Sequence, residues 1–215
     1  MKIFIDTADI NQIKEACSWG VIDGVTTNPS HVAKTGRPAA DVYRDICAFV
    51  KGPISLETIG LTAPEIVKEG RALAKLAPNV VIKVVNTVEG LKAVKELSAE
   101  GFKTNVTVTF SPTQALLAAK CGATYISPFV GRLDMFGHMG MELVRQIKTI
   151  YDNYDYKTEI IVAAVRHQTH VLESALCGAH ICTMAPDVIK QLFQHPLTDI
   201  GIQNFLNDWK TVPQK

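Results

Sequence analysis

No apolar run in the 215-residue sequence approaches the roughly 20 residues that a membrane-spanning helix needs. The first residues, MKIFIDTADI, lack the apolar segment and the small-residue cleavage site of a signal peptide. An excess of one charge is also missing, since 22 Lys and Arg stand against 21 Asp and Glu. We therefore expect a cytoplasmic protein that binds neither membranes nor nucleic acid and that holds any acidic ligand with locally placed cations.

Motifs for a disulfide framework or a metal site are also missing. The five cysteines form no C-x-x-C pair, so those in apolar helical stretches are predicted to be buried thiols in a reducing compartment. The chain has no HExxH motif, and no cysteine pair accompanies His138, His167, His170 or His180 near the predicted strand ends. We predict no catalytic metal and no cofactor, with His167 and His170 in supporting or surface positions.

Eight short β-rich runs alternate with longer amphipathic stretches, which indicates parallel βαβ units. The first run ends in Asp6-Thr7-Ala8, without the glycine-rich phosphate turn that a doubly wound open sheet usually carries. The sequence therefore predicts an α/β fold, a single (β/α)8 TIM barrel over residues 1–215. The eight runs are residues 2–6, 22–27, 53–59, 79–85, 103–109, 124–129, 158–164 and 180–184.

One more helical pattern follows the eighth βα unit, and we expect a helical extension over residues 198–215. Its apolar residues form a stripe at helical spacing. Such a stripe either packs back across the barrel or docks on a neighbouring subunit, and the sequence does not separate the two. The stripe consists of Ile202, Phe205, Leu206 and Trp209.

Lys83 is the most informative single residue, because it lies in the run Val-Val-Ile-Lys-Val-Val. A charged ammonium is costly to bury, and an interior parallel strand has no wet face. One interpretation is a lysine that snorkels from a strand edge. The other is an amine activated by its surroundings to attack a carbonyl group.

Two carboxylates and two arginines hold comparable positions at the predicted strand ends. Asp6 closes the first strand, although it could equally precede a helix as an N-cap, and Glu57 sits between apolar neighbours in the third. Two acids and a lysine in one barrel suit general acid–base and Schiff-base chemistry. Arg132 and Arg166 follow the sixth and seventh strands and could form a bidentate phosphate clamp or lie on the surface.

Eight segments carry a family resemblance: FIDTAD (4–9), DGVTTNPS (23–30), VIKV (81–84), VEGLKAVKELSAEG (88–101), TNVT (104–107), ISPFVGRLD (126–134), VRH (165–167) and HPLTDIG (195–201). DGVTTNPS and SPFVGRLD are long and specific. Over essentially its whole length the chain resembles the short transaldolases, which are close relatives of the fructose-6-phosphate aldolases.

The resemblance implies a metal-free Schiff-base mechanism. Lys83 would condense with a ketose phosphate, and Asp6 would take the hydroxyl proton during carbon–carbon cleavage. Glu57, with a water and Thr107, would shuttle protons as the carbinolamine forms and dehydrates.

The resemblance also assigns the contacts to the substrate. Three polar side chains would hold the hydroxyls of the dihydroxyacetone unit: Asn28, Asn105 and Ser127. Arg132 and Arg166 would bind the phosphate.

The implied activity is transfer of dihydroxyacetone from sedoheptulose 7-phosphate or fructose 6-phosphate to glyceraldehyde 3-phosphate or erythrose 4-phosphate, in the non-oxidative pentose phosphate pathway. The aldolase relatives carry glutamine in place of Glu57 and tyrosine in place of Phe129, so the resemblance favours transfer over simple cleavage. A non-catalytic barrel that binds sugar phosphates is the alternative from a different class.

Two departures from the family pattern concern affinity rather than chemistry. Ala164 stands where a phosphate-binding serine is usual, and Val85 where a proline is usual. Loss of a hydrogen bond to a charged group costs about 1.5–3 kcal/mol, which would weaken phosphate binding. The family also implies a homo-oligomer, a pentamer or decamer in which the C-terminal helix reaches a neighbouring subunit.

Overall fold

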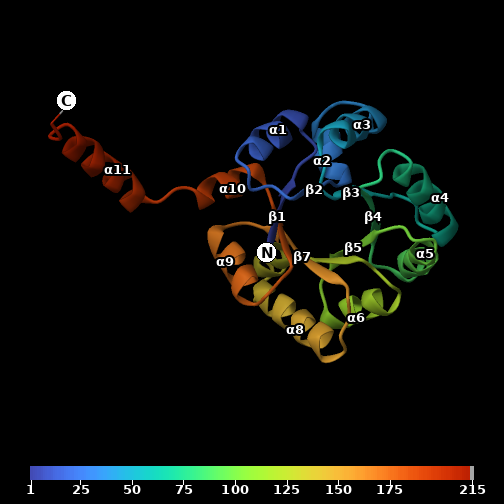
Figure 1. Cartoon of the computed structure of the whole chain (residues 1–215). Helices are drawn as coiled ribbons and strands as arrows, with labels where there is room; N and C mark the ends of the chain where they lie inside the picture. Colours follow the sequence, from blue (N-terminus) through green and yellow to red (C-terminus); the bar gives the residue numbers. More distant parts are fainter. Residues whose placement is uncertain (214–215) are drawn as a thin grey trace.

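The strands of the chain, described for residues 1–213 in a computed structural model, form a closed barrel in the order β1 to β8 (Figure 1). All eight neighbouring pairs are parallel. The strands are β1 (Lys2–Asp6), β2 (Gly24–Thr26), β3 (Ile54–Glu57), β4 (Val80–Val85), β5 (Thr104–Thr109), β6 (Tyr125–Pro128), β7 (Glu159–Val165) and β8 (Ile181–Met184).

Helices surround the barrel, as the alternation of strand and helix patterns predicts (Figure 1). Within residues 1–213, no helix is long and apolar enough to cross a membrane. The helices are α1 (Ile10–Ser18), α2 (Pro29–Lys34), α3 (Ala39–Phe49), α4 (Ala63–Ala74), α5 (Val88–Ala99), α6 (Pro112–Lys120), α7 (Val130–Met135), α8 (Gly140–Asn153), α9 (Gln168–Leu176), α10 (Pro186–Leu192) and α11 (Pro196–Trp209). The expected TIM barrel with an additional C-terminal helix is therefore confirmed.

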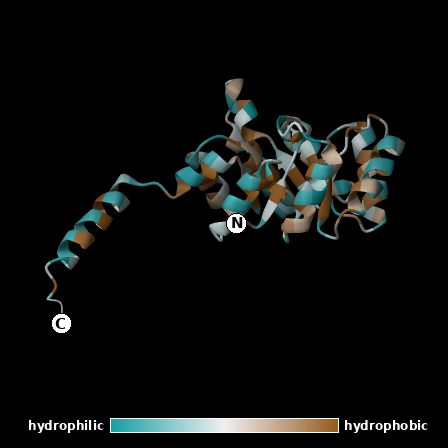
Figure 2. Cartoon of the chain, turned by 90° about the horizontal axis from the view of Figure 1, so that it is seen from above, coloured by the Kyte–Doolittle hydropathy of each residue, from teal (hydrophilic) through white to brown (hydrophobic). Residues whose placement is uncertain are grey.

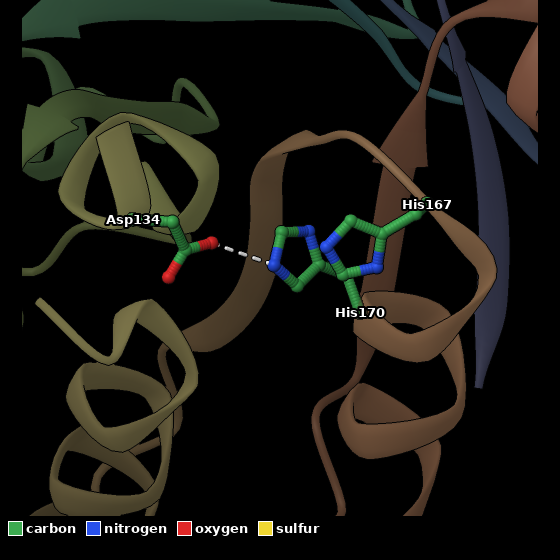
Figure 3. Close-up of side chains that lie close together, drawn as sticks. All are labelled: Asp134, His167 and His170. Atoms are coloured by element: carbon green, nitrogen blue, oxygen red, sulfur yellow. Dashed lines mark ion pairs between the residues drawn. The ribbon is translucent and has the colours of Figure 1, made fainter. Parts of the chain in front are cut away.

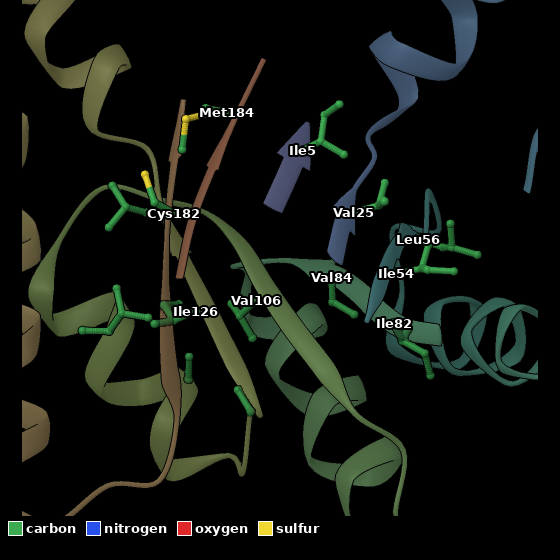
Figure 4. Packing of buried hydrophobic residues seen from close by; sticks show 14 of the residues in the cluster. Ile5, Val25, Ile54, Leu56, Ile82, Val84, Val106, Ile126, Cys182 and Met184 are labelled. Carbon is green, nitrogen blue, oxygen red and sulfur yellow. The ribbon is translucent and has the colours of Figure 1, made fainter. Parts of the chain in front are cut away.

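Two apolar layers hold the barrel, because successive side chains of a strand point to opposite faces. The outward layer packs under the helices, as Figure 4 shows for Ile5, Val25 and Val84. The inward layer is a separate cluster of five buried side chains, which we call the barrel floor. The floor consists of Phe4, Val81, Tyr125, Ile161 and Ile181.

Capping residues fix where the helices begin. Asp9 accepts hydrogen bonds from the first backbone N–H groups of α1, and Ser111 forms a capping box with Gln114 at the start of α6. The loops that lead into these two helices follow β1 and β5, so they lie on the carboxyl side of the barrel. The five cysteines are free thiols. Cys182 is fully buried, and the other four are partly buried against the hydrophobic core rather than fully buried as predicted.

Two β-bulges interrupt the barrel on its carboxyl side. The register shifts between Val106 and Thr109 in β5 and again between Val162 and Val165 in β7. Inside these bulges Val108 and Ala164 each have a φ of 57°. A positive φ strains a residue with a side chain, above all a β-branched one, and such strain concentrates at functional sites.

Helix α11 extends away from the barrel rather than packing across it (Figures 1 and 2). None of its residues is buried, and the predicted stripe from Ile202 to Trp209 is exposed. The interpretation that the stripe packs back on the barrel is therefore wrong for this chain, since no barrel surface covers it. The helix runs over Pro196–Trp209, so it begins before the expected 198–215 and ends earlier, and residues 214–215 lie outside the described range.

Candidate active site

A cavity of about 400 Å³ opens at the carboxyl ends of the strands, where barrel enzymes place their sites. Eight of the ten predicted site residues line it. They are Asp6, Asn28, Glu57, Lys83, Ser127, Phe129, Arg132 and Arg166. The other two, Asn105 and Thr107, lie beneath the lining and are fully buried.

The cavity stands directly above the barrel floor. Asp6 follows Phe4 by two residues, and Lys83 follows Val81 by two, so each pair points to the same inner face. Inward-facing side chains two positions apart on one strand therefore belong to different layers, the first to the apolar floor and the second to the polar cavity.

Lys83 does not snorkel to a strand edge, because its residue is only 4% exposed. Its ammonium lies 2.9 Å from Oε2 of Glu57, on the neighbouring strand, and donates to the backbone oxygen of Thr27 at 2.9 Å. The parallel register of β3 and β4 sets this contact by pairing Glu57 with Lys83. A buried amine beside a carboxylate has both the nucleophile and the acid–base group that imine formation requires.

Asp6 faces the same cavity with a different partner on each carboxylate oxygen. Oδ1 accepts a hydrogen bond from the Thr26 hydroxyl at 2.8 Å, and Oδ2 lies 3.4 Å from Nε2 of His31. Burial raises the pKa of Asp6, but hydrogen bonding to His31, the positive charge of Lys83 and the Thr26 hydroxyl bring the pKa below its ordinary value. The carboxylate is therefore ionised at neutral pH.

A chain of hydrogen bonds fixes the polar residues behind the cavity wall. Ser127 donates to Oδ1 of Asn105 at 2.8 Å, and the Asn105 amide donates to the Ser55 hydroxyl at 3.1 Å. The Thr107 hydroxyl is buried and has no hydrogen-bond partner within residues 1–213. A buried hydroxyl normally finds a partner, so Thr107 has hydrogen-bonding capacity left for a ligand or a water.

Arg132 and Arg166 reach the cavity from α7 and from the end of β7, and both are exposed. Gly131 explains why these two elements approach so closely. A Cβ at Gly131 would lie 2.2 Å from the Ala164 backbone oxygen and 2.7 Å from Cγ of Arg166. Glycine therefore allows the two arginines to converge on one side of the opening, a geometry suited to a phosphate group.

A hydrogen-bonded network with His170 at its centre supports both arginine-bearing segments, and Figure 3 shows its contact with Asp134. Nε2 of His170 lies 2.7 Å from Oδ2 of Asp134, in the same helix as Arg132, and Nδ1 accepts the backbone N–H of Arg166 at 3.2 Å. The other Asp134 oxygen accepts the backbone N–H of Gly140 at 2.8 Å. The network therefore ties α7, α8 and the end of β7 together.

Within residues 1–213, the same region contains one group of candidate metal ligands, because atoms of Asp134, His167 and His170 lie within 4.8 Å of one another. The two imidazole rings, however, stack with centroids 3.8 Å apart and planes at 34°. Both nitrogens of His170 already have partners in the network. A metal would have to separate the rings and displace Asp134 from its hydrogen bond, so this arrangement suits a supporting role for His167 and His170.

Several cavity residues escape prediction from the sequence. His31 and Lys34 enter from α2, and Thr26 and Thr183 enter from β2 and β8, where their hydroxyls lie 2.6 Å apart. The two threonines follow the same alternation that places Asp6 and Lys83, so the strand period could have revealed them. His31 lies on a short helix, α2, whose phase the sequence does not fix.

A family model described as Transaldolase/Fructose-6-phosphate aldolase matches residues 3–215. The chain belongs to this family. A "Probable transaldolase" from Aquifex aeolicus (strain VF5) is 60% identical over 215 residues, which cover 100% of this chain and 99% of the relative. Another from Caldicellulosiruptor saccharolyticus (strain ATCC 43494 / DSM 8903 / Tp8T 6331) is 59% identical, with 100% of both chains covered.

Membership of the transaldolase/fructose-6-phosphate aldolase family confirms the resemblance expected from the motifs. The chain is thus an enzyme of the transaldolase family, and the similarity extends over the barrel and the C-terminal helix alike. The alternative of a non-catalytic barrel is accordingly not supported.

Proposed function

We propose that the chain transfers a dihydroxyacetone unit from a ketose phosphate to an aldose phosphate through a Schiff base on Lys83. The observation that carries the proposal is the buried contact of 2.9 Å between the Lys83 ammonium and Glu57, within a cavity that Arg132 and Arg166 also line. Binding alone would need no buried amine. Fructose 6-phosphate and sedoheptulose 7-phosphate are the proposed donors, in the non-oxidative pentose phosphate pathway of the cytoplasm.

The proposed first stage is imine formation. Lys83 attacks the donor ketone, and Glu57 exchanges protons as the carbinolamine loses water. The unpartnered hydroxyl of Thr107 supports a share in this step, together with a water. Asn28, Ser127 and, through Ser127, Asn105 are the proposed contacts of the dihydroxyacetone hydroxyls.

The proposed second stage is cleavage and transfer. Asp6 takes the hydroxyl proton, the carbon–carbon bond breaks, and its electron pair moves into the protonated imine. Glyceraldehyde 3-phosphate leaves, and erythrose 4-phosphate or another aldose phosphate is attacked by the bound three-carbon unit. Hydrolysis of the resulting imine releases Lys83.

Simple aldol cleavage is the second candidate, because the family description covers both activities. Glu57 and Phe129, which packs edge-on against Phe110 with ring centroids 5.9 Å apart, favour transfer. The two residues stand where the aldolase relatives are expected to carry glutamine and tyrosine. Replacing both, as Glu57→Gln with Phe129→Tyr, should raise the ratio of cleavage to transfer.

Borohydride trapping tests the proposal. The enzyme is incubated with fructose 6-phosphate, reduced and digested for mass spectrometry, with and without erythrose 4-phosphate. A three-carbon adduct on Lys83 that disappears when the acceptor is present is the expected result. Absence of any adduct on Lys83 would falsify the Schiff base.

The proposal extends to assembly. The exposed apolar stripe of α11, which no part of the barrel covers, supports a homo-oligomer, with a pentamer or decamer expected. Light scattering tests it, and a monomeric mass would contradict it.

A further inference from the structure

We propose that His31 is a further catalytic residue, which accepts from Asp6 the proton released in carbon–carbon cleavage and later returns it. This inference rests on the proposed transaldolase function. It starts from a contact that the acid–base scheme of Lys83, Glu57 and Asp6 does not use. Nε2 of His31 lies 3.4 Å from Oδ2 of Asp6, and both side chains line the cavity and are 23% exposed.

Local contacts of α2 hold the His31 ring beside Asp6. Asn28 caps α2 by accepting the backbone N–H of His31 at 2.9 Å, and Pro29 begins the helix. Thr26 occupies the other oxygen of Asp6, so Oδ2 is left facing the imidazole. The distance of 3.4 Å is longer than an ordinary hydrogen bond, and catalytic contacts of this kind commonly tighten when substrate binds.

Asp6 alone is a poor place to keep a proton. Before cleavage, hydrogen bonding to His31, the positive charge of Lys83 and the Thr26 hydroxyl all favour its ionised form, and the charge on the Lys83 nitrogen is lost only when the imine accepts the electron pair of the broken bond. In water an imidazole is more basic than a carboxylate by roughly 2.6 pKa units. An imidazole within reach is therefore a better carrier than Asp6 for the proton that Asp6 takes from the substrate.

The reaction needs a group that stores this proton, because cleavage of the donor and attack on the acceptor occur at different times. In cleavage, the substrate O–H bond breaks and the proton goes to Asp6. With His31 in the tautomer that carries its proton on Nδ1, the Asp6 O–H bond then breaks as an N–H bond forms at Nε2. The first aldehyde leaves while His31 holds the proton. When the acceptor is attacked, the proton returns through Asp6 to the oxygen that was the acceptor carbonyl, and no oxidant or metal is needed.

Charged groups from several elements surround His31. Asp6 faces it from β1, and three further groups of the cavity belong to its surroundings: Glu57 from β3, Lys83 from β4 and Lys34 from α2 itself. A small adjoining pocket adds Asp9 and Asp187. Because the pKa of Asp6 lies below its ordinary value, Asp6 stays ionised over the whole pH range of the test described below.

The test compares the full-length enzyme with His31→Gln, whose amide can donate to Asp6 but cannot carry a proton, and with His31→Leu, which can do neither. His138→Gln is the matched control, because His138 is exposed and does not line the cavity. For each protein, kcat and KM for transfer from fructose 6-phosphate to erythrose 4-phosphate are measured from pH 5.5 to 9. Borohydride trapping reports the adduct on Lys83.

We expect His31→Gln and His31→Leu to lose roughly 100-fold in kcat, the lower end of the range for general acid–base groups, with KM little changed. The acid limb of the kcat profile should disappear in both, and trapped Lys83 should carry more uncleaved six-carbon donor relative to the three-carbon unit. His138→Gln should match the unaltered enzyme.

Three results would overturn the role of His31. Activity of His31→Gln within twofold of the unaltered enzyme with the same acid limb would leave His31 a lining residue. Loss in the leucine variant alone would reduce it to a hydrogen-bond donor, and a change confined to KM would reduce it to a substrate contact. A missing Lys83 adduct in the unaltered enzyme would instead refute the proposed function itself.

Discussion

The barrel floor and the polar layer above it come from the same strands and the same inner face, yet their side chains differ in almost every property. The floor contains four aliphatic or aromatic residues that match polar ones two positions later. A step of two residues, about 7 Å along a strand, therefore separates a packed core from a reactive cavity. The pairs are Phe4 and Asp6, Val81 and Lys83, Tyr125 and Ser127, and Ile181 and Thr183.

The comparison teaches where the fold gains stability and where it gives some up. Burial of the floor side chains removes apolar surface from water and stabilises the barrel. Burial of Lys83 beside Glu57 carries a desolvation cost that their attraction offsets only in part. Substitutions in the polar layer should therefore act mainly on activity, and substitutions in the floor mainly on stability.

The largest effect is expected at Lys83. Lys83→Met removes the amine and leaves Glu57 buried without its cation, so activity should fall roughly a thousand-fold or more. Coupled assays of transfer and borohydride trapping measure the loss. An active Lys83→Met enzyme would show that the polar layer works without a Schiff base.

A change one layer lower should act on stability instead. Phe4→Ala removes a fully buried ring that packs against Gly24, and should lower the free energy of unfolding by about 3–5 kcal/mol. Urea unfolding monitored by circular dichroism measures it, and the adduct on Lys83 should still form in the folded fraction. A loss below about 1 kcal/mol would mean that the floor is not a packed layer.

A smaller effect is expected at His170, which supports the cavity from outside. His170→Asn removes the link between Asp134 and the Arg166 backbone, so KM for the phosphorylated donor should rise about tenfold, the equivalent of 1.4 kcal/mol. The kcat should change little, because His170 contacts none of the proposed reacting groups. An unchanged KM would show that Arg166 keeps its position unaided.

Strain at the cavity should yield a still smaller change. Val108→Gly relieves a positive φ of 57° but adds chain entropy to the unfolded state, so we expect a net gain of about 0.5–1 kcal/mol. Val106→Gly, in the outward layer, is the matched control and should be destabilising. Thermal unfolding measures the stability of both variants. A destabilised Val108→Gly variant would show that packing of the valine side chain stabilises the fold by more than the strained backbone destabilises it.

The least effect should come from mild acid. Burial and the nearby His167 lower the pKa of His170 more than Asp134 raises it. Burial also lowers the pKa of His180, which directly precedes β8 on the amino side of the barrel. Since the unfolded chain then binds more protons below about pH 6.5, stability should fall as the pH drops through that value toward the folded pKa values.

The melting temperature at pH 5.5 should accordingly lie below that at pH 7.5. His180→Asn should reduce the difference without altering KM, whereas His170→Asn should reduce it and raise KM. A melting temperature that rises with acid would contradict the assignment of neutral histidines at both ends of the barrel.

Most strands and helices of the barrel can be predicted from the sequence, because the periodicity of apolar residues in a strand or a helix is a local property. Asp6, Glu57 and Lys83 could be predicted from polar residues in otherwise apolar strands, and they do meet at one cavity. Asn105, a proposed contact of the dihydroxyacetone hydroxyls, is fully buried and accepts a hydrogen bond from Ser127; its depth within the barrel depends on the stagger of the strands, which the sequence does not give.

Other features depend on contacts between distant segments and could not be predicted. His31 meets Asp6 only because α2 folds over the end of β1, and the bulge at Val108 needs neighbouring strands to hold its strained backbone. The direction of α11 is set by a short link after α10. The apolar stripe allowed for an exposed helix face, but it did not predict the direction in which the helix leaves the barrel.

The floor also has a kinetic consequence. Because five side chains close the barrel from below, the described part of the chain gives the cavity access from the carboxyl side of the strands. In the proposed reaction, the first aldehyde must therefore leave by the route through which the acceptor arrives. Double-reciprocal plots at several acceptor concentrations should give parallel lines, and excess acceptor should compete with the donor for the unoccupied enzyme.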